Sequence, residues 1–163
     1  FGRLDVLVNS ASTYVRNDLL SVTAEEWDHF MAVNLRAPFL VTREADRLLK
    51  ATRGSVVNIV DLSAFQPWVE FPHHAVSKAA LLHLTKVQAR AMAPSVRVNA
   101  VAPGNVLPPE GDDDVAIEAS RRRIPLGRIG HPDDIVGAVR FLAGASYVTG
   151  EVLVVDGGRL LDP

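Results

Sequence analysis

The chain has 163 residues, of which 48% are hydrophobic, and its formal net charge at pH 7 is −2. This length fits one domain with a sizeable core, and the evenly mixed charges argue against nucleic-acid or membrane-surface partners. With no cysteine and no apolar run near the roughly 20 residues that span a bilayer, we expect neither disulfides nor a membrane span, and we expect a cytoplasmic location.

Strand-like and helix-like segments alternate along the chain. The first helical segment opens with Thr23 and Glu26, which have the spacing of a capping box. In chain order, we expect a strand over residues 4–11, a helix over 23–50, a strand over 54–61, a helix from 73 or 74 to 92, a strand over 96–102, a weakly helical lid over 108–123, a helix over 132–143 and a strand over 151–155.

These elements predict an α/β fold, a doubly wound parallel sheet of the Rossmann-like kind. The expected strands are apolar almost throughout, as in parallel strands covered by helices on both faces. In such a fold a Gly-rich phosphate turn follows the first strand, and the chain contains no G-x-G-x-x-G stretch. We therefore expect residues 1–163 to be a single partial domain, the C-terminal two-thirds of the fold. The strand over 4–11 should then be buried on both faces.

Residues able to do chemistry follow the expected strands, at the edge where open parallel sheets bind ligands. Asn9 follows the first strand and Asp61 ends the second. His74 and Lys78 are four residues apart near the start of the next helix, so they share one helical face. An acid, an imidazole and an ammonium group should therefore converge on one crevice. Taken singly, Asp61 is more commonly a turn cap, and His74 with Lys78 is more commonly a surface pair, so the prediction rests on the joint order and spacing of these residues.

Six motifs in order resemble the short-chain dehydrogenase/reductase family from its fourth strand to its C-terminus. They are LDVLVNSAS, VNLRAPF, GSVVNIVD, HAVSKAAL, VRVNAVAPG and VTGEVLVVDGG. The resemblance implies an NAD(P)-binding Rossmann-like domain, an NAD(P)-dependent oxidoreductase activity and a small-molecule substrate. It also implies that the N-terminal Gly-rich segment lies upstream of Phe1.

The resemblance implies catalytic roles for Asn34, Asp61, His74 and Lys78. Family members have a Ser, a proton-donating Tyr and a ribose-binding Lys, and an Asn holds a water of the proton relay. Here Lys78 and Asn34 match, whereas Asp61 stands at the Ser position and His74 at the Tyr position. Aspartate at that position resembles the pteridine reductases and bacterial dihydromonapterin reductases, as does the Asn-Ser-Ala-Ser stretch. An imidazole is able to donate a proton near neutral pH, but it is shorter than a phenol.

The same resemblance implies a cofactor site and no metal site. The residues implied are Asn9 and Ala11 on the adenine-ribose side, Lys78 at the nicotinamide ribose, and Pro103, Gly104 and Val106 at the nicotinamide. Pro108 stands where the family often has a phosphate-binding Thr. Analogy with the pterin reductases favours NADPH over NADH.

Three hypotheses follow. The leading one is an NAD(P)H-dependent reductase of a pterin or a similar C=N or C=O substrate. The first alternative is a generic 3-oxoacyl or carbonyl reductase. The second is a catalytically degenerate relative that serves as a cofactor-binding or oligomerising scaffold. The resemblance also implies a homo-oligomer, a dimer or tetramer, formed through the helices over 23–50 and 74–92.

Overall fold

A single parallel sheet organises the molecule. The structure, a computed structural model, describes residues 1–107 and 114–161. The strands lie in the order β1-β2-β3-β4, and each pair is parallel. Their bounds are β1 (Val6–Asn9), β2 (Ser55–Ile59), β3 (Arg97–Pro103) and β4 (Val152–Val155). The predicted parallel α/β class is confirmed.

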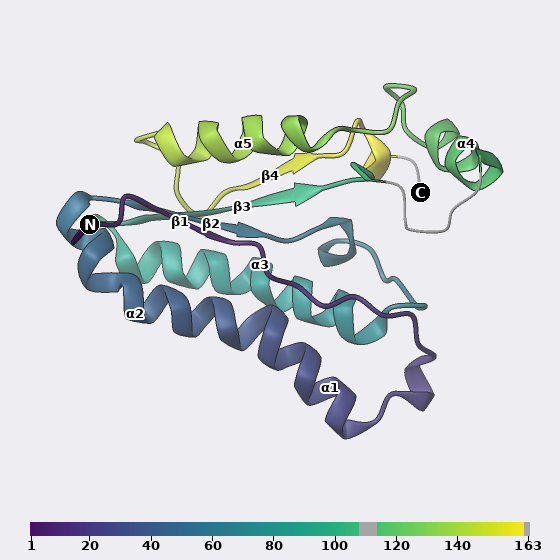
Figure 1. Cartoon of the computed structure of the whole chain (residues 1–163), viewed down its shortest axis with the longest axis horizontal. Coiled ribbons are helices and arrows are strands. Elements are labelled where there is room, and N and C mark those ends of the chain that lie inside the picture. The colour runs from purple at the N-terminus through teal and green to yellow at the C-terminus, as the bar shows by residue number, and fades with distance from the viewer. Residues whose placement is uncertain (108–113, 162–163) are drawn as a thin grey trace.

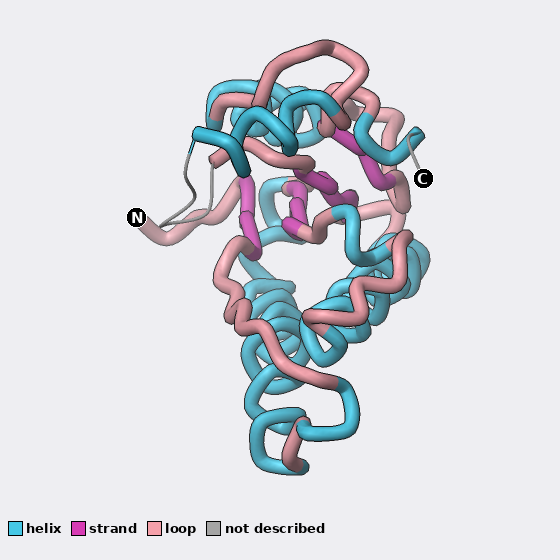
Figure 2. Tube along the Cα trace, turned by 90° about the vertical axis from the view of Figure 1, so that its right-hand side faces the viewer, coloured by secondary structure: helices cyan, strands magenta, loops and turns pink. Residues whose placement is uncertain are grey.

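Helices cover both faces of the sheet (Figure 1). On one face lie α1 (Ala24–Met31), a π-helical turn η2 (Ala32–Arg36), α2 (Ala37–Thr52) and α3 (Pro72–Met92), and on the other lies α5 (Pro132–Gly144). Figure 2 shows the strands enclosed between these two helical layers. Another helix, α4 (Asp114–Arg122), lies beyond the carboxyl ends of the strands (Figure 1). The described residues also form three 3-10 turns, η1 (Leu19–Ser21), η3 (Leu62–Ala64) and η4 (Arg159–Leu161).

The helix expected over residues 23–50 is three consecutive helical segments. The predicted capping box is confirmed: the Thr23 hydroxyl accepts from the Glu26 N–H at 3.2 Å, and the Glu26 carboxylate accepts from the Thr23 N–H at 2.8 Å. The π-helical turn at Ala32–Arg36 was not predicted. It carries Asn34, which is fully buried. Such turns occur frequently at functional sites because they re-aim one side chain.

The strands alternate between two cores. Val56 and Val98 pack toward α2 and α3 with Leu49, whereas Val57 and Val101 pack toward α5. All five of these side chains are fully buried. The central strands β2 and β3 are thus apolar on both faces, which explains why their sequence shows no alternation.

The first strand departs from expectation. Val6 and Val8 are 38% and 42% exposed, although burial on both faces was predicted. Among the described elements, α5 contacts β2, β3 and β4 repeatedly, and β1 pairs with β2 alone. The α5 side of β1 is therefore uncovered, and that prediction is wrong for these two valines.

One further prediction lies partly outside the described residues. The lid expected over residues 108–123 is described only from residue 114, where α4 begins, and Pro108 lies outside the described residues.

None of the described helices is long and apolar enough to cross a lipid bilayer.

Candidate active site

An aspartate and a histidine form the centre of the site. Asp61 is the second residue after β2, and its carboxylate caps the turn η3 by accepting from the Ser63 N–H at 2.8 Å. His74 lies in the first turn of α3, which starts at Pro72. The Asp61 Oδ2 and His74 Nε2 atoms are 2.6 Å apart. The predicted convergence of acid and imidazole therefore takes the form of a direct, short hydrogen bond.

Both ring nitrogens of His74 face acceptors. Nδ1 lies 3.0 Å from the Thr13 carbonyl oxygen, which cannot donate, so Nδ1 carries a proton. The Ser63 N–H and hydroxyl both donate to Asp61 Oδ1. Burial, the largest influence, raises the pKa of Asp61, but hydrogen bonds from His74 and Ser63 and the charges of His74 and Lys78 lower it below its ordinary value. The Asp61 Oδ2 and His74 Nε2 atoms therefore share one proton in their 2.6 Å hydrogen bond, because two lone pairs would repel each other at this distance.

The carboxylate is the more accessible half of this pair. The Asp61 side chain is 21% exposed and the His74 side chain only 4%. A ligand entering the crevice consequently meets Asp61 first, with His74 behind it.

Lys78 lies one helical turn beyond His74 and is buried. Its Nζ donates to the Ile59 carbonyl at 2.9 Å, at the end of β2. Burial lowers the pKa of Lys78, and the nearby Asp61 charge only partly opposes this. An ammonium group has three donors, and this is its one hydrogen bond to the described residues. Two N–H groups are left for ligand oxygens.

Asn34 braces the loop that holds His74. Its amide nitrogen donates to the Thr13 carbonyl at 3.1 Å and to the Ser77 hydroxyl at 2.9 Å, while its oxygen accepts from the Thr13 N–H at 2.8 Å. Ser77 in turn donates to the His74 carbonyl at 2.7 Å. All four residues given catalytic roles in the sequence analysis are therefore brought together. The sequence analysis did not identify Thr13 and Ser77. No local sequence pattern indicates that the Thr13 carbonyl accepts from the His74 ring, or that the Ser77 hydroxyl links Asn34 to the His74 backbone.

Comparison with known proteins agrees with this geometry. A family model described as enoyl-(acyl carrier protein) reductase matches residues 1–159. The chain belongs to the short-chain dehydrogenase/reductase family. It is 40% identical to the 2-dehydro-3-deoxy-D-gluconate 5-dehydrogenase of Bacillus subtilis over 97% of the chain and 65% of that protein. It is 38% identical to the 3-oxoacyl-(acyl-carrier-protein) reductase FabG of Thermotoga maritima over 99% of the chain and 68% of that protein.

A solved structure extends the likeness. A protein from Agrobacterium tumefaciens, solved with bound NADP, is 39% identical and superimposes with a TM-score of 0.88 over 96% of this chain and 68% of that one. The chain thus spans about two thirds of the length of the short-chain dehydrogenases/reductases that it matches.

Asn9, one of the predicted cofactor residues, has its side chain committed within the protein. Its amide nitrogen donates to Asn58 at 2.8 Å and to Thr42 at 3.2 Å, and Asn58 donates onward to Thr85 at 2.9 Å. This chain of buried amides ties β1 to β2, α2 and α3. Both amide N–H donors of Asn9 are therefore used within the protein. Ala11, the next predicted residue, is exposed beyond the end of β1.

Gly104, which follows Pro103 at the end of β3, has a packing role. A Cβ at this position would lie 2.7 Å from both Cα and Cβ of Asp156, the residue after β4. The close approach of these two chain segments requires glycine, independently of any cofactor contact.

We expect Gly104→Ala to lower the free energy of unfolding by about 1–3 kcal/mol because the backbone must shift to relieve this overlap. Gly137→Ala is the matched control, since a Cβ there meets nothing within 4 Å and the residue lies inside α5. That change should be neutral or stabilise by up to about 1 kcal/mol. Denaturant unfolding of the full-length protein measures both, and equal effects would contradict the packing role.

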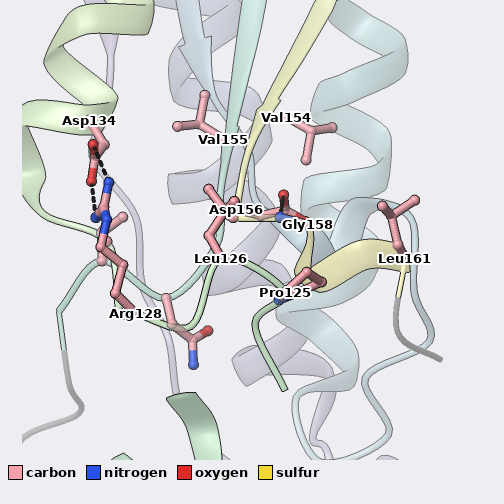
Figure 3. A pocket seen from close by; sticks show the side chains of 13 residues that line it. Pro125, Leu126, Arg128, Asp134, Val154, Val155, Asp156, Gly158 and Leu161 are labelled. Carbon is pink, nitrogen blue, oxygen red and sulfur yellow. Dashed lines mark hydrogen bonds and ion pairs between the residues drawn. The ribbon is translucent and has the colours of Figure 1, made fainter. Parts of the chain in front are cut away.

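Val106 opens onto a cavity of about 460 Å³ at the carboxyl ends of β3 and β4. Figure 3 shows Arg128 and Asp134 pointing toward one another on one wall, with Pro125, Leu126 and Leu161 on the other. The Arg128–Asp134 pair is joined by two hydrogen bonds of 2.8 and 3.0 Å and holds the loop that enters α5. Among the described residues, no group of three or more metal-ligating side chains gathers anywhere.

His73, the neighbour of His74, is a buried part of the core. Its ring stacks on Phe30 with centroids 3.6 Å apart, and its Nδ1 accepts from the His74 N–H at 3.1 Å. Burial is the main reason that the pKa of His73 lies below its ordinary value of 6.5, although Glu26 opposes the shift. Protonation at Nδ1 would also break the hydrogen bond to the His74 N–H.

This gives stability a pH dependence. Since the folded-state pKa of His73 is lowered, the unfolded chain gains the proton first, and stability is lost as the pH falls below about 6.5. In His73→Phe, which keeps the stack on Phe30, this loss should be absent. Unfolding of both proteins at pH 7.5 and pH 5 measures the difference. If the variant loses as much stability on acidification as the native protein, His73 is not the responsible group.

Proposed function

We propose that this chain is the larger part of an NAD(P)-dependent oxidoreductase that interconverts an alcohol and a carbonyl compound. The observation that carries the proposal is the short hydrogen bond between Asp61 and His74, 2.6 Å long beside the buried Lys78, at the carboxyl ends of the strands. Family membership supports the reaction class, and the NADP bound to a solved relative supports the cofactor. NADPH is proposed over NADH on the same ground.

Lys78 and the end of β3 fit the cofactor. Lys78 has two N–H groups available for ribose hydroxyls, and Pro103, Gly104 and Val106 would form the wall for the nicotinamide. When bound, a reduced nicotinamide supplies a hydride to the carbonyl carbon. Hydride addition leaves an alkoxide oxygen, which needs one proton.

The Asp61–His74 pair would hold that proton. In reduction the pair releases its shared proton to the alkoxide and later takes one from solvent. In oxidation the deprotonated pair takes the hydroxyl proton. Loss of the proton leaves the Nε2 lone pair facing a carboxylate, because Thr13 fixes the other ring proton on Nδ1. This arrangement makes the deprotonated pair a strong proton acceptor, as general base catalysis needs.

The substrate hypotheses are unequally supported. The hypothesis of a pterin substrate is based on Asp61 and the Asn-Ser-Ala-Ser stretch. In this chain both carboxylate oxygens of Asp61 already have hydrogen-bond partners, His74 and Ser63, which weakens that hypothesis. The relatives compared above carry the names of a sugar-acid dehydrogenase and a 3-oxoacyl reductase. We therefore propose the generic carbonyl reductase, the first alternative from the sequence, over the pterin reductase. A cytoplasmic location stays a prediction.

The test uses the full-length protein and follows NADPH consumption with a panel of ketones, oxo acids and dihydropterin, with NADPH binding measured separately by calorimetry. Turnover of any ketone or oxo acid supports the proposal, and turnover of dihydropterin alone would restore the pterin hypothesis. If NADPH binds and no compound turns over, the catalytically degenerate scaffold is the better description.

We also propose a homo-oligomer formed through α2 and α3, whose outer faces expose large apolar side chains. The exposed fractions of Phe39, Val41, Val76 and Val87 are 43%, 47%, 46% and 51%. Apolar patches of this kind mark subunit interfaces. Light scattering of the full-length protein should show a dimer or tetramer, and Val87→Glu should shift it toward monomer. A native protein that is monomeric at micromolar concentration would contradict the proposal.

A further inference from the structure

The loop that follows β1 brings a tyrosine against the imidazole of the site. The rings of Tyr14 and His74 meet nearly at right angles, with an interplanar angle of 83° and centroids 4.9 Å apart. Aromatic pairs favour this edge-to-face arrangement. The residue before Tyr14 supplies the Thr13 carbonyl, which lies 3.0 Å from His74 Nδ1. Two consecutive residues of this loop therefore contact the His74 ring, one through its backbone and one through its side chain.

Tyr14 separates the imidazole from solvent. It is 52% exposed, whereas the His74 side chain that it contacts is only 4% exposed. Tyr14 also lines a cavity of about 440 Å³, and His74 is not one of the residues that line it. A water molecule in this cavity therefore meets the tyrosine ring rather than the imidazole.

A second aromatic contact holds the Tyr14 ring in place. Tyr14 stacks on Phe71 with centroids 4.3 Å apart and an interplanar angle of 12°. Phe71 directly precedes α3, the helix that carries His74. Arg16 lies over the Phe71 ring at 5.7 Å and also pairs with Glu70 at 3.2 Å. The loop is thus attached to the segment that enters α3, and the position of Tyr14 against His74 is fixed by both partners.

The phenol stays neutral beside the Asp61–His74 pair. Burial, the largest influence, raises the pKa of Tyr14, and the Asp61 charge raises it further. Of the two other charges that act on the phenol, Arg16 lowers this pKa and Glu70 raises it. The ring therefore adds no charge of its own next to the shared proton. An uncharged ring that excludes water lowers the local dielectric constant, and hydrogen bonds are stronger in such surroundings.

We propose that Tyr14 is a positioning residue for the proton transfer: its ring holds the His74 imidazole in line with Asp61 and keeps water from their hydrogen bond. The ring rather than the hydroxyl has this role, because Tyr14 meets His74 through its ring. Without the ring, water would approach the imidazole and compete with Asp61 for the Nε2 proton. This inference rests on the proposed function, which gives the shared proton its use.

The ¹H resonance of the His74 Nε2 proton, in full-length protein labelled with ¹⁵N-histidine, tests the inference without requiring turnover. In Tyr14→Ala this resonance should move upfield and the proton should exchange faster with water. In the same variant kcat/KM for the best carbonyl substrate should fall about 10–100-fold, because a small displacement of a catalytic group is costly. Tyr14→Phe, which keeps the ring, should retain the native resonance and the native kcat/KM.

Tyr147→Ala is the matched control, since it removes the same atoms from the other of the two tyrosines, which is fully exposed. It should change neither the resonance nor kcat/KM. An unchanged resonance in Tyr14→Ala would overturn the inference. Equal losses in Tyr14→Phe and Tyr14→Ala would overturn it as well, because the hydroxyl would then be responsible, and so would the same losses in Tyr147→Ala.

If Tyr14→Ala fails to fold, the native protein provides a second measurement. Nuclear Overhauser contacts between the ring protons of Tyr14 and His74 should be present, and their absence would overturn the inference. The outcomes also separate this inference from the proposed function. A native protein without a shared Asp61–His74 proton would overturn the proposed proton transfer, whereas a shared proton that is indifferent to Tyr14 would overturn this inference alone.

Discussion

Asp61→Asn is expected to lower kcat/KM of the full-length protein by about 10²–10⁴-fold, the usual contribution of a positioned acid or base. Asparagine has nearly the same shape, but it cannot share a proton with His74 Nε2 as a carboxylate does. NADPH binding, which we proposed to involve Lys78 and the end of β3, should remain within a few-fold. Initial rates with the best carbonyl substrate of the panel measure the effect.

Asp28→Asn is the matched control, because Asp28 is an exposed acidic residue of α1 that takes no part in the Asp61–His74 hydrogen bond. It should leave kcat/KM unchanged. An Asp61→Asn protein that keeps native kcat/KM would remove Asp61 from the proton transfer and leave its capping of η3 as its function.

The second large effect concerns stability. Leu49→Ala should lower the free energy of unfolding by about 2–5 kcal/mol, because a fully buried leucine leaves a cavity that its surroundings fill only partly. Leu49 is 0% exposed and packs with Val56 and Val98 between α2 and the sheet. Urea unfolding at pH 7.5 with the full-length protein provides the measurement.

Leu20→Ala removes the same atoms from a side chain that is 94% exposed, in the turn η1. It should change the unfolding free energy by less than about 0.5 kcal/mol. A small loss for Leu49→Ala, comparable to that of Leu20→Ala, would show that the core beneath α2 is not packed as described.

Sequence periodicity was sufficient for the sheet and for the site's principal residues. Parallel strands bring their carboxyl ends to one edge, and residues four apart share a helix face, so Asp61, His74 and Lys78 had to come close together. Their direct hydrogen bond did not follow, because its length depends on where η3 turns the chain after β2. Ser63 lies in that turn and donates to the Asp61 carboxylate.

Features that depend on contacts between residues far apart in the chain could not be predicted from local sequence patterns. Asn9 was assigned to the cofactor, but its amide binds Asn58 and Thr42, which only the sheet register brings near. Gly104 needs its small size because Asp156 approaches from β4. Val6 and Val8 carry the apolar signal of a buried strand, yet α5 does not extend over them. In each case the deciding neighbour lies more than 30 residues away, beyond the reach of local patterns.

The ¹⁵N and ¹H resonances of the His74 ring, in full-length protein labelled with ¹⁵N-histidine and assigned with His74→Gln, test the shared proton of the Asp61–His74 pair most directly. Two protonated ring nitrogens at pH 7, with a strongly deshielded Nε2 proton that disappears in Asp61→Asn, are the expected result. A neutral ring with an unprotonated Nε2, or a spectrum that Asp61→Asn leaves unchanged, would contradict the shared proton on which the proposed reaction depends.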